Sequence, residues 1–86
     1  MNFDTDDRIK LWVITDDATN VKIYTTSAPL HKLNRYLFGL EMEHIIDSDK
    51  HESVFNYFKK EAIDNMHIGE VCFCDGVSVA CVELKE

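Results

Sequence analysis

The sequence predicts an α+β fold in which an antiparallel sheet of four or five strands carries two helices packed on one face. Two pairs of alternating apolar segments are each separated by turn-forming residues, as in β-hairpins. Between these pairs, two segments have apolar residues at helical spacing. Because hairpins connect neighbouring strands, the order β-β-α-(β)-α-β-β leads to one antiparallel sheet.

The C-terminal hairpin, residues 68–84, has the clearest signal, because its apolar runs flank Asp75-Gly76. This dipeptide favours the positive φ angles of a two-residue type I′ turn. The turn pairs Cys74 with Val77. Since side chains alternate along a strand, one face then carries Ile68, Glu70, Cys72, Cys74, Val77, Val79, Cys81 and Glu83, and the other Val71, Phe73, Ser78, Ala80, Val82 and Leu84. Both faces are apolar near the turn, so the hairpin is central in the sheet or a partner covers one face.

The N-terminal hairpin is predicted from residues 8–15 and 21–26, with a five-residue loop between them. Pairing Thr15 with Val21 places four aliphatic side chains on the core face: Leu11, Val13, Val21 and Ile23. The opposite face mixes aromatic rings with lysines, which suits a half-exposed surface or an interface: Lys10, Trp12, Lys22 and Tyr24.

Two helices are predicted between the hairpins. Ser27 is expected to cap a helix that begins at Ala28-Pro29 and ends at Gly39. Its apolar stripe is Leu30, Leu33, Tyr36 and Leu37. Asp49 and Glu52 resemble a capping box that opens a second helix over residues 50–64, with an apolar face of Val54, Phe55, Phe58 and Ala62. The intervening residues 40–47 fit either a short edge strand or an extended loop.

Composition limits the classes of function. The 86 residues predict one domain, residues 8–86, preceded by a short acidic arm, residues 1–7. A net charge of −7 argues against direct nucleic-acid binding. No apolar run reaches the roughly 18 residues of a membrane span. Three cysteines, with no secretory signal at residues 1–8, favour a reducing, cytoplasmic location.

No catalytic residue, cofactor or metal ligand is predicted, so we expect a protein that is not an enzyme. The three cysteines share one face with Glu70 and Glu83, with no base to activate a thiol, and we interpret them as buried, reduced thiols. A Cys-x-Cys pair in a strand does not wrap a metal ion as zinc sites do. The histidines and carboxylates at positions 44, 47, 49 and 51 match no ligand spacing either. A metal-dependent module is therefore only a third alternative.

The distribution of carboxylates suggests the first functional hypothesis. It is a small, acidic, intracellular binding protein that occludes a partner's surface, as an inhibitor, an antitoxin-like or immunity-like protein, or a nucleic-acid mimic does. The expected partner is a protein, with a basic nucleic-acid-binding protein as one candidate. The partner-binding residues are acidic side chains with two aromatic anchors: Asp4, Asp6, Asp7, Trp12, Asp16, Asp17, Tyr24, Glu41, Glu43, Asp47 and Asp49.

The alternative hypothesis is a homodimeric structural domain. In this interpretation two copies bury the spare face of the C-terminal hairpin, through contacts of Cys72, Cys74 and Val79.

Overall fold

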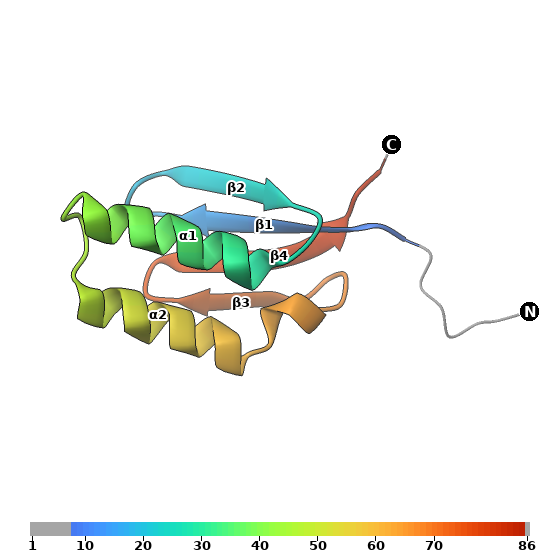
Figure 1. Cartoon of the computed structure of the whole chain (residues 1–86). Coiled ribbons are helices and arrows are strands. Elements are labelled where there is room, and N and C mark those ends of the chain that lie inside the picture. The colour runs from blue at the N-terminus through green and yellow to red at the C-terminus, as the bar shows by residue number, and fades with distance from the viewer. Residues whose placement is uncertain (1–7, 86) are drawn as a thin grey trace, which may run out of the picture.

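The computed structural model describes residues 8–85, which form a four-stranded antiparallel sheet and two helices (Figure 1). The elements are β1 (Lys10–Asp16), β2 (Val21–Thr25), α1 (Pro29–Met42), α2 (Ser48–Lys60), a short 3-10 helix η1 (Ile63–Asn65), β3 (Val71–Cys74) and β4 (Val77–Glu83). The strand order in the sheet is β2-β1-β4-β3, so β1 and β4 are central. The predicted α+β class is confirmed, with four strands.

The helices form one layer and the sheet forms the other. Figure 1 shows α1 and α2 side by side on one face of the sheet, with no helix on the opposite face of the part drawn in colour. The β1–β2 turn, the α1–α2 connection and the β3–β4 turn meet at one end of the molecule. The described chain begins and ends at the other end.

The C-terminal hairpin has the predicted register. Asp75 and Gly76 have φ angles of 52° and 86°, as a type I′ turn requires. Cys74 pairs with Val77, and the pairing continues to Val71 and Ala80, so β3 begins three residues later than the predicted hairpin. The face with the three cysteines packs against the helices, and Val77, Val79 and Cys81 are buried there.

The N-terminal hairpin differs from its prediction by one residue. Asp16, rather than Thr15, pairs with Val21, which leaves a four-residue turn. Because side chains alternate, this shift exchanges the two faces of β1. Trp12 therefore lies in the core with 6% of its surface exposed, and the expected core residues Leu11 and Val13 face away from the helices.

Polar contacts explain this register. The Asp16 carboxylate accepts hydrogen bonds from the Ala18 backbone N–H at 3.0 Å and from the Tyr36 hydroxyl at 2.6 Å. The Trp12 indole N–H donates to the Ile63 carbonyl at 2.8 Å. The shifted register gives these buried polar atoms their partners, as buried polar groups require.

Helix α1 continues through Gly39 to Met42, so residues 40–47 form no strand and the expected end at Gly39 is wrong. A glycine inside a helix costs roughly 1 kcal/mol relative to alanine, but the next turn buries Leu40 in the core. The helix ends where His44 adopts a left-handed φ of 63°. The Ile45 N–H then donates to the Leu40 carbonyl at 2.9 Å, as in a Schellman motif.

The predicted N-caps of both helices are also wrong. Ser27 does not cap α1. Instead, the Leu30 N–H donates a hydrogen bond to the Asp64 carboxylate at 3.0 Å. Asp64 lies 34 residues further along the chain. Helix α2 is capped by Asp47, which accepts from the Lys50 N–H at 2.8 Å, two residues before the expected cap.

The C-terminus of α2 also lies earlier than expected. The helix ends at Lys60 rather than near residue 64, because Ala62 adopts a left-handed φ of 54° before the chain enters η1. Ala62 is exposed and does not join the apolar face of the helix, whereas Val54 and Phe58 are fully buried there.

The hydrophobic core lies between the helices and one face of the sheet. We call this sheet face the covered face. Its main apolar residues are Trp12, Ile14, Ile23, Cys72, Cys74, Val77, Val79 and Cys81. The helix layer and the segment after it supply Leu33, Leu37, Leu40, Val54, Phe58, Ile63 and Met66.

Candidate protein-interaction surfaces

The opposite side of the sheet, here called the open face, is covered by no element among residues 8–85. Strand alternation and the observed register assign its residues. They are Leu11, Val13, Thr15, Lys22, Tyr24, Val71, Phe73, Ser78, Ala80 and Val82. The Leu84 N–H donates to the Ile9 carbonyl at 2.8 Å, which adds these two side chains at one end of the face.

The most exposed large apolar side chains of the open face lie on its two edge strands. On the edge strands, Tyr24 is 61% exposed, Val71 65% and Phe73 58%. The register places Val13 between Tyr24 and Ala80, and Ala80 next to Val71. The small Ala80 thus lies between the larger side chains of Val13 and Val71.

The open face is almost free of charge. Lys22 is its one charged residue among residues 8–85, because the register directs every described carboxylate of the strands to the covered side or into a turn. Large exposed apolar patches on soluble proteins commonly mark interaction sites. This surface can therefore bury apolar area without desolvating an ion pair.

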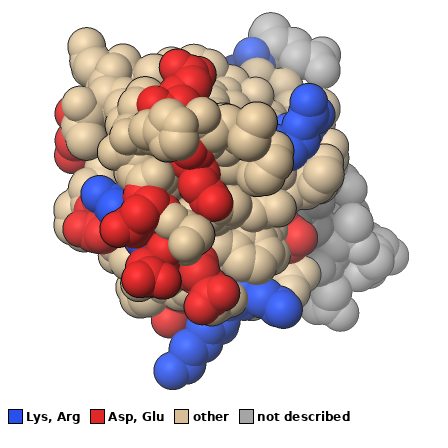
Figure 2. Space-filling view, turned by 60° about the vertical axis from the view of Figure 1, so that its left-hand side comes forward, with Lys and Arg blue, Asp and Glu red and all other residues tan. Residues whose placement is uncertain are grey.

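A second candidate surface, here called the acidic end, lies where three connections of the chain meet. It consists of Asp17, Glu43, Asp47, Asp49 and Asp75. The Asp17 N–H donates to the Gly76 carbonyl at 2.9 Å, which joins the two hairpin turns. Lys50 Nζ lies 3.8 Å from the Asp75 carboxylate, and this ion pair connects α2 to the β3–β4 turn. Figure 2 brings this end forward and shows acidic side chains close together, with a basic side chain among them.

The structure divides the predicted partner-binding residues. Asp17, Glu43, Asp47 and Asp49 are exposed at the acidic end, and Tyr24 is exposed on the open face. The remaining described residues do not have the surface position expected of them, for the reasons given next. Asp4, Asp6, Asp7 and the rest of the predicted acidic arm lie outside the described residues.

Trp12, Asp16 and Glu41 make contacts within the chain instead. Trp12 is buried, which corrects its expected position on an exposed face. Asp16 is only 5% exposed, and its carboxylate binds Tyr36. Glu41 is half-buried and lies 2.6 Å from Nδ1 of His51, which joins α1 to α2.

Burial of Tyr36 and its bond to Asp16 have a further electrostatic effect. Burial first, and then donation of the hydroxyl proton to the Asp16 carboxylate, raise the pKa of Tyr36 to about 12. The phenol stays neutral at physiological pH and acts as a donor that holds Asp16 at the end of β1.

The cysteines face the helix layer as thiols. Burial raises the pKa of the Cys72 thiol, and Glu61 and Glu70 raise it further. Burial and Asp75 raise the pKa of Cys74 as well. A raised pKa keeps a thiol protonated and a weak nucleophile. Among residues 8–85, no group of three or more histidine, cysteine or carboxylate side chains could hold a metal ion.

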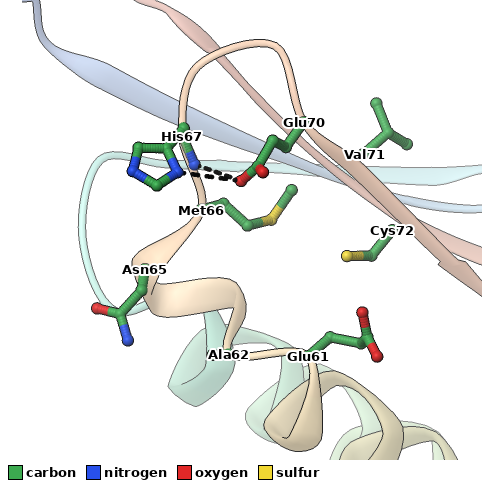
Figure 3. A pocket seen from close by; sticks show the side chains of 8 residues that line it. All are labelled: Glu61, Ala62, Asn65, Met66, His67, Glu70, Val71 and Cys72. Atoms are coloured by element: carbon green, nitrogen blue, oxygen red, sulfur yellow. Dashed lines mark hydrogen bonds and ion pairs between the residues drawn. The ribbon is translucent and has the colours of Figure 1, made fainter.

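A cleft with a volume of about 500 Å³ lies between the end of α2, the segment before β3 and β3 itself (Figure 3). Met66 and Cys72 line its interior, and His67 and Glu70 lie at one side. The Glu70 carboxylate accepts from the His67 backbone N–H at 2.7 Å, and this bond is the main reason why the pKa of Glu70 is lowered. His67 and Cys72 come from opposite sides of the cleft, so the two do not form a nucleophile–base pair.

The interface predicted for a homodimer needs correction. Cys72, Cys74 and Val79 lie on the covered face, where Val79 is fully buried under the helices. The spare face of the C-terminal hairpin is the one with Val71, Phe73 and Val82. The alternation in this hairpin separates the two faces, but only the position of the helices shows which of them is open.

Helices α1 and α2 have 14 and 13 residues, and no helix in the described part of the chain has the length and apolar character needed to cross a bilayer. Comparisons of the chain with models of protein families, with curated proteins and with solved structures find no match.

Proposed function

We propose that this chain is a non-catalytic protein-binding domain whose interface is the open face. The observation that carries the proposal is the exposure of a broad, nearly uncharged apolar surface on one side of a sheet whose other side packs against two helices. Its location is a reducing compartment such as the cytoplasm, since the three cysteines are thiols in the fold.

The energetics favour the open face over the acidic end as the main interface. Burial of apolar surface contributes roughly 25 cal/mol per Å², and aromatic side chains often provide the main anchors of interfaces. Tyr24 and Phe73 supply such anchors at the two edges of the open face. Exposed ion pairs contribute about 0–1 kcal/mol each, and Lys50 already offsets part of the charge at the acidic end.

A second candidate function keeps the acidic end as the binding surface. The fold brings together carboxylates that are up to 58 positions apart in the sequence, from Asp17 to Asp75. This gathering supports a role in which the acidic end occludes a basic surface, such as that of a nucleic-acid-binding protein. The two candidates differ in salt dependence, because salt screens charge pairs and leaves apolar burial intact.

Capture of proteins from the native cells at low and high salt tests the proposal, with two glutamate variants compared with the wild type. Phe73→Glu places a charge on the open face. Phe38→Glu is the matched control, since Phe38 is 54% exposed on α1, in the layer on the other side of the sheet.

We expect the wild type to capture a protein that stays bound at high salt. Phe38→Glu is expected to bind the same protein, and Phe73→Glu is expected not to bind it. Calorimetry with the purified components then measures this binding. A partner that is lost at high salt and binds both variants equally well overturns the proposal and supports the acidic end instead.

A further inference from the structure

We infer that the partner of the open face is a second copy of this chain. This inference rests on the proposed function and identifies its partner. Two copies pack their open faces together to form a two-sheet sandwich, with the helices of each copy on the outside. Stacked sheets lie about 10 Å apart, and antiparallel sheets pack in this way readily.

Charge favours a second copy at this surface. The chain has a net charge of −7, so two copies repel each other wherever their carboxylates meet. The open face has no carboxylate among the described residues, and the acidic end lies at the edge of the molecule where the turns meet. A face-to-face dimer thus keeps the acidic groups in solvent.

The two edges of the open face carry exposed aromatic side chains. Tyr24 and Phe73 project from the edge strands, while Ala80, a small residue, lies between Val13 and Val71 in the row across the sheet. In a symmetric pair each copy offers both exposed aromatic rings and the small Ala80. An aromatic ring of each copy can then pack over Ala80 of the other, which is an isologous contact.

The area is compatible with a small dimer interface. Four strands about 4.8 Å apart, with up to seven residues rising about 3.3 Å each, span on the order of 400 Å² in projection. This is about half of the roughly 800 Å² of accessible surface per partner that stable protein interfaces bury. The exposed side chains of Tyr24, Val71 and Phe73 add accessible surface to the flat projection.

Sedimentation equilibrium of the purified full chain tests the inference. The wild type is expected to be a dimer at micromolar concentration. Phe73→Glu is expected to weaken the dimer at least about 100-fold, because symmetry buries the introduced carboxylate twice. Phe38→Glu is expected to dimerise like the wild type. Far-UV circular dichroism checks that each variant is folded.

A monomeric wild type at the highest soluble concentration overturns the inference, as does a folded Phe73→Glu variant that dimerises like the wild type. These results are separable from a failure of the proposed function. If the wild type is monomeric and Phe73→Glu still loses a captured partner that Phe38→Glu keeps, the open face binds another protein. If the wild type is monomeric and neither variant changes binding, both proposals fail.

Discussion

The covered and open faces belong to the same four strands, yet they differ in the hydrogen bonding and the exposure of their side chains. The covered face includes Trp12 and Asp16, and each has its polar atoms bonded within the chain. Residues 8–85 contain no buried side-chain nitrogen or oxygen without a partner. The open face carries Tyr24 and Phe73, which lie more than half exposed to solvent.

This difference shows that hydrophobicity alone does not select the inner face of a sheet. In β1, Leu11 and Val13 are as apolar as Trp12 and Ile14, and either pair could have formed the core. The face that turns inward is the one whose polar atoms find acceptors or donors on the helix side. A buried polar group left unpaired costs about 1–3 kcal/mol, which is enough to select one register over its neighbour.

The largest expected effect comes from truncating one aromatic residue on each face. Trp12→Ala is expected to lower the free energy of unfolding by about 3–5 kcal/mol, because it leaves a cavity in the core. Tyr24→Ala is expected to lower it by less than about 1 kcal/mol. Urea denaturation of the three proteins at equal, dilute concentration measures both effects. Equal losses, or a greater loss for Tyr24→Ala, would contradict the burial of Trp12 and the exposure of Tyr24.

An intermediate effect is expected from the polar pair on the covered side. Tyr36→Phe removes the donor to the buried Asp16 carboxylate and is expected to lower the free energy of unfolding by about 1–3 kcal/mol near neutral pH. The pKa of Tyr36 is raised to about 12 in the fold. Above about pH 10 the unfolded chain releases this proton while the folded chain keeps it, so the stabilisation decreases as the pH rises toward 12.

Urea titrations at neutral pH and in steps from about pH 10 to about pH 12 measure this loss. The difference in stability between the wild type and Tyr36→Phe is expected to narrow across that window. Contributions from side chains that both proteins share cancel in the difference. A difference that stays constant with pH would mean that the folded tyrosine does not hold its proton more firmly than the unfolded one.

The smallest expected effect concerns Ala62, which lies between α2 and η1. Ala62 has a left-handed φ of 54°, a region in which an L-residue with a Cβ is strained. Ala62→Gly is expected to raise the free energy of unfolding by about 0.5–1 kcal/mol. Ala18 is the control, since it is exposed in a turn without a positive φ, and Ala18→Gly is expected to destabilise. Thermal denaturation of both variants compares the signs of the two changes. A loss of stability in both would contradict the left-handed conformation of Ala62.

The sequence alone determined the class of the fold and the turn and register of the C-terminal hairpin. Asp75-Gly76 encodes its turn locally, and the turn sets the register from Cys74 and Val77 outward. Helical periodicity likewise predicted that Leu33, Leu37, Val54 and Phe58 face the core. These features depend on residues that are close together in the chain, so the local sequence is enough to predict them.

Tertiary contacts decided the rest. The register of the first hairpin depends on Tyr36 and Ile63, which lie 20 and 51 residues from the strand atoms that they bind. Asp64 supplies the acceptor at the start of α1 from 34 residues away. The sequence also did not identify the open face, because alternation divides a strand into two sides but does not show which side the helices cover. Only the folded chain brings these distant groups together, since a buried polar atom takes whichever partner the packing places beside it.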